Sequence, residues 1–157
     1  MKNIWIDKEF KKEYIGSAKQ SGIRIKYDNE INLDLICEYK EFIKWLRNKY
    51  YFPIRINVFF YNISKFKSKK DGHTYYGVFF EGENNKRKIY PQIHLAAKTN
   101  KVEDVLFGLI HELSHYFQWF FYEDNKRSDR SLEIEANKYA KYILLRYYDE
   151  KTMLRPA

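Results

Sequence analysis

The residues with the clearest chemical potential form the segment His111-Glu112-Leu113-Ser114-His115, an H-E-x-x-H pattern. On a helix, residues four apart lie on one face about a turn apart, so both imidazoles can reach a single metal ion. Glu112 then points to one side, toward a water molecule on that metal. Zinc hydrolases use this spacing for two ligands and a general base. The pattern therefore predicts a zinc site with His111 and His115 as ligands and Glu112 as the catalytic base.

A catalytic zinc ion normally has three protein ligands and keeps one position for water. The downstream segment offers two carboxylates, Glu133, which lies 18 residues after His115 (133 − 115), and Glu135. Glu133 lies about 60° from the centre of that segment's apolar face, and Glu135 about 100°, at about 100° per residue. Glu133 is therefore favoured as the third ligand, with Glu135 as the alternative. Asn137, one turn beyond Glu133, is expected to hydrogen-bond a ligand histidine and fix its tautomer.

These residues require two helices to position them. Apolar residues recur at helical spacing over residues 102–120 and again over 132–147, and a polar connection at 123–128 separates the two segments. The expected caps are Asn100 with Glu103, as in a capping box, for the first helix, and Ser128 or Asp129 for the second.

The preceding part of the chain predicts one helix and a small sheet. Residues 33–50 have amphipathic helical spacing after a possible N-cap at Asn32, and residues 64–72 form a Lys-rich loop. Pro91 cannot donate to a sheet ladder, so the last expected strand should have an open edge. The expected strands are 23–27, 54–60, 75–80 and 88–97. The fold class predicted is α+β, with a three- or four-stranded, mostly antiparallel sheet.

The combination of H-E-x-x-H with Glu133-x-x-Ala136-Asn137-x-Tyr139-Ala140 resembles the gluzincin pattern of zinc metallopeptidases. It is most similar to the small ImmA/IrrE-type family, in which a phenylalanine stands where this chain has Tyr139. The match covers about the last third of the chain. The resemblance implies hydrolysis of protein or peptide substrates, one Zn²⁺ held by His111, His115 and Glu133, and Glu112 as general base. It also implies a minimal zincin-like fold, in which an edge strand precedes the active-site helix.

Two further features bear on the active site. His94 lies on the expected strand before the active-site helix, so it is a candidate cleft residue or oxyanion donor, as are His73 and several tyrosines. Gln118, three residues after His115, gives a weaker resemblance to SprT-like proteins, which work near DNA. The usual third ligand of those proteins is a downstream histidine, and none follows His115 in this chain.

Length and composition set the wider frame. The chain has 157 residues, 45% of them apolar, so one domain over residues 1–157 with a hydrophobic core is expected. Charges interrupt the apolar runs, so neither a signal peptide nor a membrane span is expected, and a cytoplasmic protein is the default. The single cysteine, Cys37, excludes an internal disulfide, and its apolar-periodic surroundings predict burial.

The net charge of +8 is unevenly distributed. Residues 1–100 hold 20 basic and 11 acidic residues, whereas residues 101–157 hold 9 and 10, so the basic excess belongs to the helix-plus-sheet part and not to the zinc-binding helices of residues 101–150. The alternation of lysines and aromatic residues from Tyr61 to Lys67 leaves a second hypothesis open. In it, the basic part docks nucleic acid or an acidic partner, with or without proteolysis.

Overall fold

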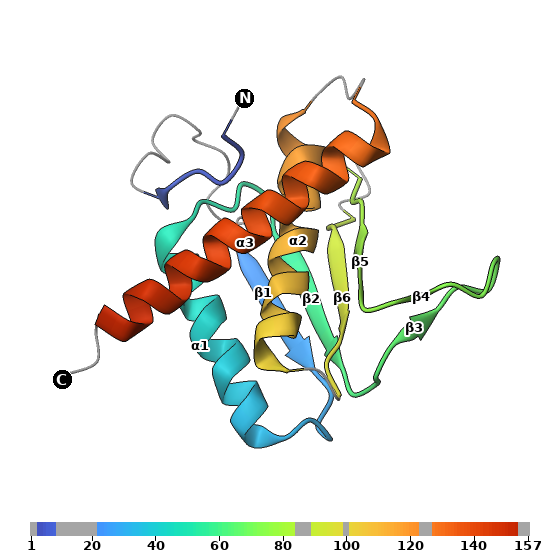
Figure 1. Ribbon diagram of the computed structural model, residues 1–157, viewed down its shortest axis with the longest axis horizontal. Helices are drawn as coiled ribbons and strands as arrows, with labels where there is room; N and C mark the ends of the chain where they lie inside the picture. The colour runs from blue at the N-terminus through green and yellow to red at the C-terminus, as the bar shows by residue number, and fades with distance from the viewer. Residues whose placement is uncertain (1–2, 9–21, 84–88, 99–100, 123–126, 154–157) are drawn as a thin grey trace.

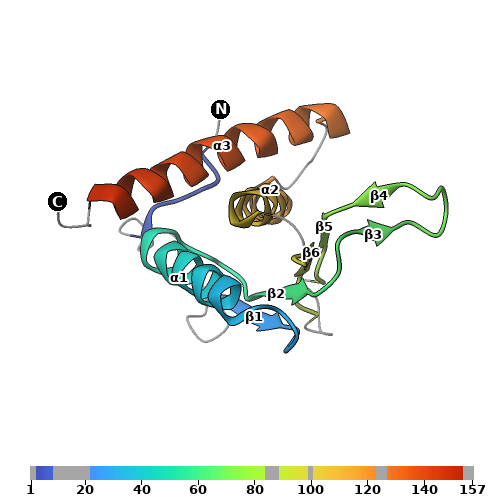
Figure 2. The same ribbon diagram turned by 60° about the horizontal axis from the view of Figure 1, so that its bottom comes forward.

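The computed structural model describes residues 3–8, 22–83, 89–98, 101–122 and 127–153, and these contain three helices and six strands. In chain order the elements are β1 (Ile23–Tyr27), α1 (Leu33–Lys49), β2 (Ile56–Tyr61), β3 (Phe66–Lys67), β4 (Thr74–Tyr75), β5 (Gly77–Phe80), β6 (Gln92–Ala96), α2 (Val102–Phe121) and α3 (Asp129–Met153). All three helices lie on one side of the larger sheet, and the β3–β4 hairpin projects away from it (Figures 1 and 2). The α+β fold class is confirmed.

The main sheet has four strands in the order β1-β2-β6-β5. The pairs β1–β2 and β2–β6 are parallel, and only β5–β6 is antiparallel. The prediction of a mostly antiparallel sheet is therefore wrong. The physical reason is that α1 carries the chain back across the sheet between β1 and β2, which makes the two strands parallel neighbours.

The expected open edge at residues 88–97 is also wrong. β6 is an interior strand with partners on both sides, and among the described strands β5 forms that edge of the sheet. Pro91 precedes β6, and its carbonyl accepts a hydrogen bond of 3.1 Å from the Asn57 amide. A proline just before a strand removes no donor from the ladder.

The stretch expected as one strand at 75–80 is divided between two sheets. Thr74 and Tyr75 pair with Lys67 and Phe66 in the hairpin, whereas Gly77–Phe80 joins the main sheet. The region expected as a loop at 64–72 therefore contains a short strand. Gly72 has a positive φ of 72° in the hairpin turn, a conformation that glycine adopts without steric cost.

The hydrophobic core lies between the sheet and the helices. Along β2 the side chains of Ile56, Val58 and Phe60 are buried, while the alternate residues are only partly so. Tyr39 of α1 stacks on Phe60 with ring centroids 4.6 Å apart. Cys37 lies on the outward side of α1 and is exposed, so its predicted burial is wrong. It occupies a position of the helix that faces away from the sheet.

The helix caps agree in part with expectation. Asn32 caps α1 by accepting a hydrogen bond of 2.8 Å from the Asp34 amide, and Ser128 accepts one of 3.1 Å from the Ser131 amide at the start of α3. The N-cap of α2 is Lys101, without a capping side chain. The expected cap Asn100 lies outside the described residues.

Hydrogen bonds of two buried aromatic side chains, Trp5 and Tyr116, hold α2 in place. The Trp5 indole donates to Ser114 Oγ at 3.0 Å, and the Tyr116 hydroxyl bonds to the backbone of Ile54, which precedes β2. These bonds connect the inner side of α2 to both ends of the first 60 residues, and so set which face of α2 turns toward α3. No described helix is long and apolar enough to cross a membrane.

Candidate metal centre

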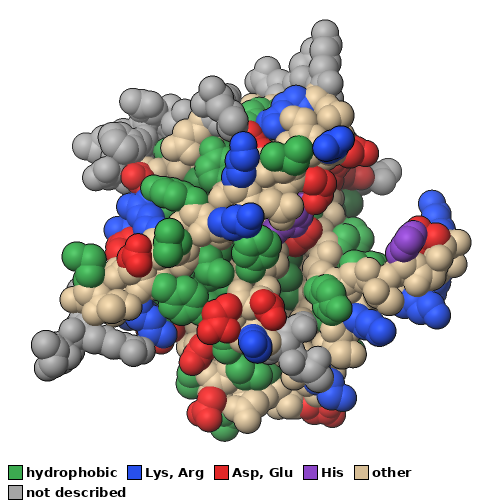
Figure 3. Space-filling model, viewed as in Figure 1, with side chains coloured by type: hydrophobic (Ala, Val, Ile, Leu, Met, Phe, Trp, Pro, Cys, Tyr) green, Lys and Arg blue, Asp and Glu red, His purple; other side chains and the backbone are tan. Residues whose placement is uncertain are grey.

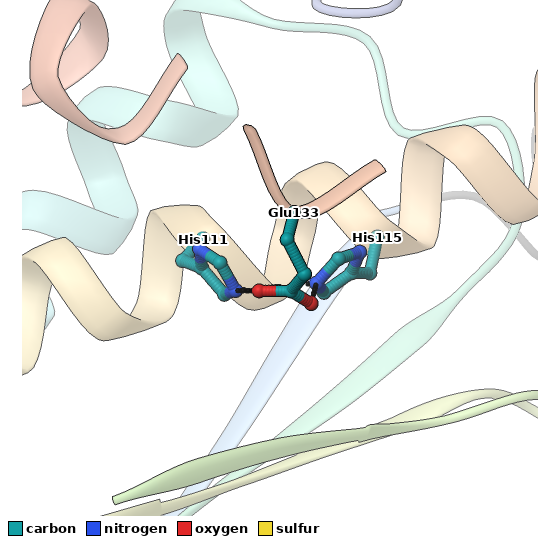
Figure 4. A group of neighbouring side chains, drawn as sticks. All are labelled: His111, His115 and Glu133. Carbon is teal, nitrogen blue, oxygen red and sulfur yellow. Dashed lines mark hydrogen bonds and ion pairs between the residues drawn. The ribbon is translucent and has the colours of Figure 1, made fainter. Parts of the chain in front are cut away.

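Three predicted site residues meet where α3 crosses α2. His111 and His115 project from α2 and Glu133 reaches them from α3 (Figure 4). Glu133 Oε2 lies 3.0 Å from His111 Nε2, and its Oε1 lies 2.7 Å from His115 Nε2. The two Nε2 atoms are 3.2 Å apart. Among the described residues, this is the group of histidine, cysteine and acidic side chains that could hold a metal ion.

Hydrogen bonding around Gln118 determines the tautomer of His115. The Gln118 Nε2 atom donates to the Leu132 carbonyl at 3.0 Å and to Glu135 Oε1 at 2.9 Å. Its Oε1 atom must therefore be the partner of His115 Nδ1, 2.8 Å away. An amide oxygen only accepts, so His115 Nδ1 carries the proton. The Nε2 atom of His115 is left with a lone pair directed at Glu133.

The donor set fits a small divalent cation. The Glu133 oxygens and the His115 lone pair are Lewis bases that repel one another at such distances unless a metal ion or protons lie between them. Ligands of a tetrahedral zinc ion bound at 2.0–2.1 Å are about 3.4 Å apart. The observed separations of 2.7–3.2 Å are close to that value. Two histidines and one carboxylate also match the ligand types of catalytic zinc.

Glu135 does not reach this group and has partners of its own. It is buried, and besides Gln118 it accepts hydrogen bonds of 3.0 Å from the Tyr122 hydroxyl and from Arg127 Nη1. A buried carboxylate needs such partners, because leaving water unpaired is costly. The structure therefore brings Glu133, and not Glu135, to the histidines, and gives Glu135 the task of holding Gln118.

Glu112 lies beside the group with its side chain almost completely buried, at 7% exposed. Its Oε2 atom has no hydrogen-bond partner among the described residues. Burial raises the pKa of Glu112 to about 7, and the neighbouring Glu133 contributes to the increase, although His115 opposes it. A Cβ atom at Gly77, the first residue of β5, would lie 3.4 Å from Glu112 Cγ and 3.0 Å from a Leu95 methyl. Glycine at this position therefore avoids a tight contact with Leu95 and leaves β5 close to the Glu112 side chain.

His111 is suited to bind a metal in its neutral form. Burial lowers its pKa below the usual value, and the nearby His115 adds to this effect, whereas Glu133 and Asn137 oppose it. Asn137 lines the same side of the site as His111, and its expected role of fixing a histidine tautomer stays a prediction. The Nδ1 atom of His111 is buried and has no hydrogen-bond partner among the described residues, so the tautomer of His111 is not held at that atom.

An open groove passes the site on both sides of Glu112. One half, of about 600 Å³, lies between the start of α2 and β5, and the other, of about 430 Å³, lies beneath the start of α3. Both halves are lined by Gly77, Glu112 and Glu133. Trp119 lines the second half, with its ring 6.2 Å from that of Phe79 on β5. The space-filling view shows histidine and acidic side chains together beside α3 (Figure 3).

The prediction that His94 lies at the cleft is wrong. Along β6, Ile93 and Leu95 point to the helices, so His94 points to the opposite face of the sheet. There it contacts the rings of Phe59 and Phe80 and bonds to Gln92 at 3.0 Å. His73, the other histidine considered as an oxyanion donor, is exposed in the projecting hairpin. Of the tyrosines, Tyr76 lines the groove.

Sequence reasoning missed the network behind His115. Gln118 was noted only for a family resemblance, and Tyr122 and Arg127 were not considered. A usable signal was present, because His115, Gln118 and Tyr122 recur at intervals of three and four residues and so share a face of α2.

Comparison with known proteins identifies no relative. No family model matches this chain, and neither a curated protein nor a solved structure matches it.

The raised pKa of Glu112 predicts a pH-dependent stability effect in the metal-free protein. Below pH 4.5 the carboxyl is protonated in both the folded and unfolded states. Above it, the unfolded state loses this proton first, so stability falls as the pH rises toward about 7. A glutamine at this position cannot ionise. The free energy of unfolding of Glu112→Gln, relative to that of the wild type, should therefore rise by on the order of 2–3 kcal/mol as the pH is raised from 4 to 8. Urea unfolding with a chelator present would measure this.

The matched control for this experiment is Glu103→Gln, which changes an exposed carboxylate of the same helix. The assignment fails if Glu112→Gln differs from the wild type by the same amount at both pH values.

The network behind His115 predicts an effect on metal affinity. Glu135→Gln replaces one acceptor oxygen with an NH2 group, which cannot accept the hydrogen bonds that Glu135 receives. Gln118 and then His115 should therefore lose their fixed orientation. Loss of such a supporting partner typically weakens metal binding by about 10- to 100-fold. Competition with a chromophoric chelator would measure zinc affinity. Glu150→Gln, on the same helix and away from the site, serves as the control, and equal affinity in both variants would contradict the role given to Glu135.

Proposed function

We propose that this protein is a zinc-dependent metallopeptidase of the gluzincin type. The observation that supports this most directly is the meeting of His111, His115 and Glu133 beside the buried Glu112, at the middle of an open groove. These positions agree with the roles that the H-E-x-x-H pattern and the downstream helix predict for the four residues. The likeness to the ImmA/IrrE-type family and to a minimal zincin-like fold is part of this proposal.

The chemistry divides between the metal and Glu112. A zinc ion held by the three ligands supplies Lewis acidity and lowers the pKa of water from 15.7 to about 7. Glu112 acts as general base, taking a proton from the attacking water and delivering it to the leaving amine. A carboxylate beside the metal ligands is suited to this task because it can accept a proton and then release it. Tyr76 lines the groove, and we take it as the candidate donor to the developing oxyanion.

The edge strand provides a means of holding a substrate. β5 bonds to β6 on one side only, among the described strands, and it also lines both halves of the groove. An extended peptide can bond to such an edge as an additional strand, which presents its backbone at regular intervals. The close approach of Gly77 to Glu112 brings that backbone near the catalytic base.

The central test combines metal content with substitution of the base. The wild type should bind one zinc ion and cleave peptides. Glu112→Gln should retain the zinc but lose about 100- to 10,000-fold in kcat, since this is the usual contribution of general acid–base catalysis. Zinc content by mass spectrometry and cleavage of a peptide library would provide both measurements.

Leu145→Ala, at an exposed position of α3, should retain zinc and activity. The proposal is contradicted if the reconstituted wild type binds no zinc, or if Glu112→Gln cleaves as fast as the wild type.

The charges along the groove indicate a substrate preference. Asp104 lies at one end of the groove, and Glu81 and Asp129 lie at the other, whereas no lysine or arginine is among its described lining residues. A protein of net charge +8 therefore has an acidic groove. Such a groove favours basic side chains on either side of the scissile bond.

We expect peptides with lysine or arginine beside the cleaved bond to have the highest kcat/KM. Exposed ion pairs contribute about 0.2–1 kcal/mol each, so the preference should be about two- to fivefold per pair. Asp104→Asn should reduce the preference on one side of the bond and Asp129→Asn on the other. The peptide-library profile would show both effects, and an unchanged profile in either variant would refute the assignment for that end.

A further inference from the structure

The face of the main sheet that points away from the helices has an unusual composition. Residues that alternate with the buried ones on β2 include Phe59 and Tyr61, and both are only partly buried. Cross-strand partners lie on the same face, so His94 of β6 lies beside Phe59, and Phe80 of β5 is on this face as well. All three helices lie on the opposite side (Figure 2). Aromatic rings thus occupy a face that no described helix covers.

These rings form one continuous series that extends into the hairpin. The centroid of His94 lies 4.9 Å from that of Phe80, 5.1 Å from Phe59 and 5.2 Å from Tyr61. Tyr61 meets Phe66 of β3 at 5.8 Å, and Phe66 stacks on Tyr75 of β4 at 5.3 Å. We call this set the outer aromatic cluster; its members are Phe59, Tyr61, Phe66, Tyr75, Phe80 and His94. None of the six is fully buried.

Basic side chains flank the cluster on two sides. On β1, Arg24 and Lys26 are exposed, and their register opposite Asn57 and Phe59 places them on the same face. The hairpin contributes four more exposed lysines, at positions 65, 67, 69 and 70. The space-filling view shows this concentration of Lys and Arg on the projecting arm (Figure 3).

The acidic groups near these lysines and this face already have partners. Asp28 accepts a hydrogen bond of 2.7 Å from the Asn62 amide, and Glu30 accepts one of 3.3 Å from the Asn62 side chain. Asp71, at the hairpin turn, accepts a hydrogen bond of 3.0 Å from the His73 amide. These amide partners are uncharged, so the three carboxylates keep their charge, but the six basic side chains outnumber them. The surface therefore offers an excess of positive charge beside aromatic rings.

We propose that this face binds single-stranded nucleic acid, with bases stacking on the outer aromatic cluster and phosphates held by the flanking lysines and arginines. Unpaired bases stack on aromatic side chains regardless of sequence, and a charged border follows the backbone. In a double helix the bases stack on one another, so they are not available to stack on the aromatic side chains of the cluster. The face lies on the other side of the sheet from the metal groove, so this activity does not depend on the proposed peptidase function.

The test is a fluorescence-anisotropy titration of the whole protein with labelled single-stranded oligonucleotides. A length of about 16 nucleotides is enough, since single domains that bind single strands cover about 4–16 nucleotides. One DNA and one RNA oligonucleotide identify the preferred sugar, and binding of either supports the proposal. Affinity should fall with salt at a slope of about −0.7 per phosphate contacted. Four contacts therefore predict a loss of about 50-fold between 50 and 200 mM salt.

Two variants separate stacking from charge. Phe80→Ala with Tyr75→Ala should weaken binding by about 5- to 150-fold for each base that loses its stacking, with the salt slope unchanged. A triple change of Lys67, Lys69 and Lys70 to Gln removes only exposed charges and should reduce both affinity and salt slope. Its matched control, Lys138→Gln with Lys141→Gln on α3, should bind as the wild type does.

Thermal unfolding identifies any variant that has lost its fold, and the triple lysine variant provides an independent test of the same surface. The proposal is overturned if neither oligonucleotide binds, or if duplex DNA binds as tightly as single strands. It is overturned as well if polyglutamate displaces the labelled oligonucleotide as effectively as unlabelled oligonucleotide does. It is also overturned if the folded aromatic variant retains wild-type affinity, since attraction would then be purely electrostatic.

Discussion

The close packing of α3 against α2 is the constraint on which the site depends. Ala136 and Ala140 of α3 are completely buried, and their small side chains allow the two helix axes to approach. Because of this approach, a glutamate side chain on one helix can reach two histidines on the other. A larger residue at either alanine would push Glu133 away from the Nε2 atoms. The geometry of the candidate metal centre is therefore a consequence of helix packing as much as of residue type.

The same packing has an electrostatic aspect. Among the buried polar side chains of these two helices are Glu112, Gln118 and Glu135. Gln118 donates a hydrogen bond to Glu135, and Tyr122 and Arg127 donate the others that Glu135 accepts. Glu112 has no equivalent partner for one oxygen. One carboxylate is thus fixed by its neighbours while the other is free to exchange a proton, and this is the division of roles that the proposed hydrolysis requires.

The features that could be predicted from the sequence are those set by residues close together along the chain, whereas contacts between distant segments could not be predicted. The helical spacing of His111 and His115 and the direction of Glu133 follow from local periodicity, and the structure brings these three together. The parallel strand pairs could not be inferred, because alternation of side chains shows that a strand exists but does not identify its neighbours. His94 was misplaced for the same reason, since its face depends on which side of the sheet the helices cover. The bond from Gln118 to Glu135 joins two helices, and no local pattern specifies such a pair.

Trp119 has a consequence for studying this protein in solution. Its indole lines the groove beside His115, whereas Trp5 is packed in the core and Trp45 lies on α1. A molecule that enters the groove changes the surroundings of one tryptophan and leaves the other two as they were. The chain therefore carries an intrinsic fluorophore at its proposed active site, and occupancy of that site can be observed through its emission without any attached label.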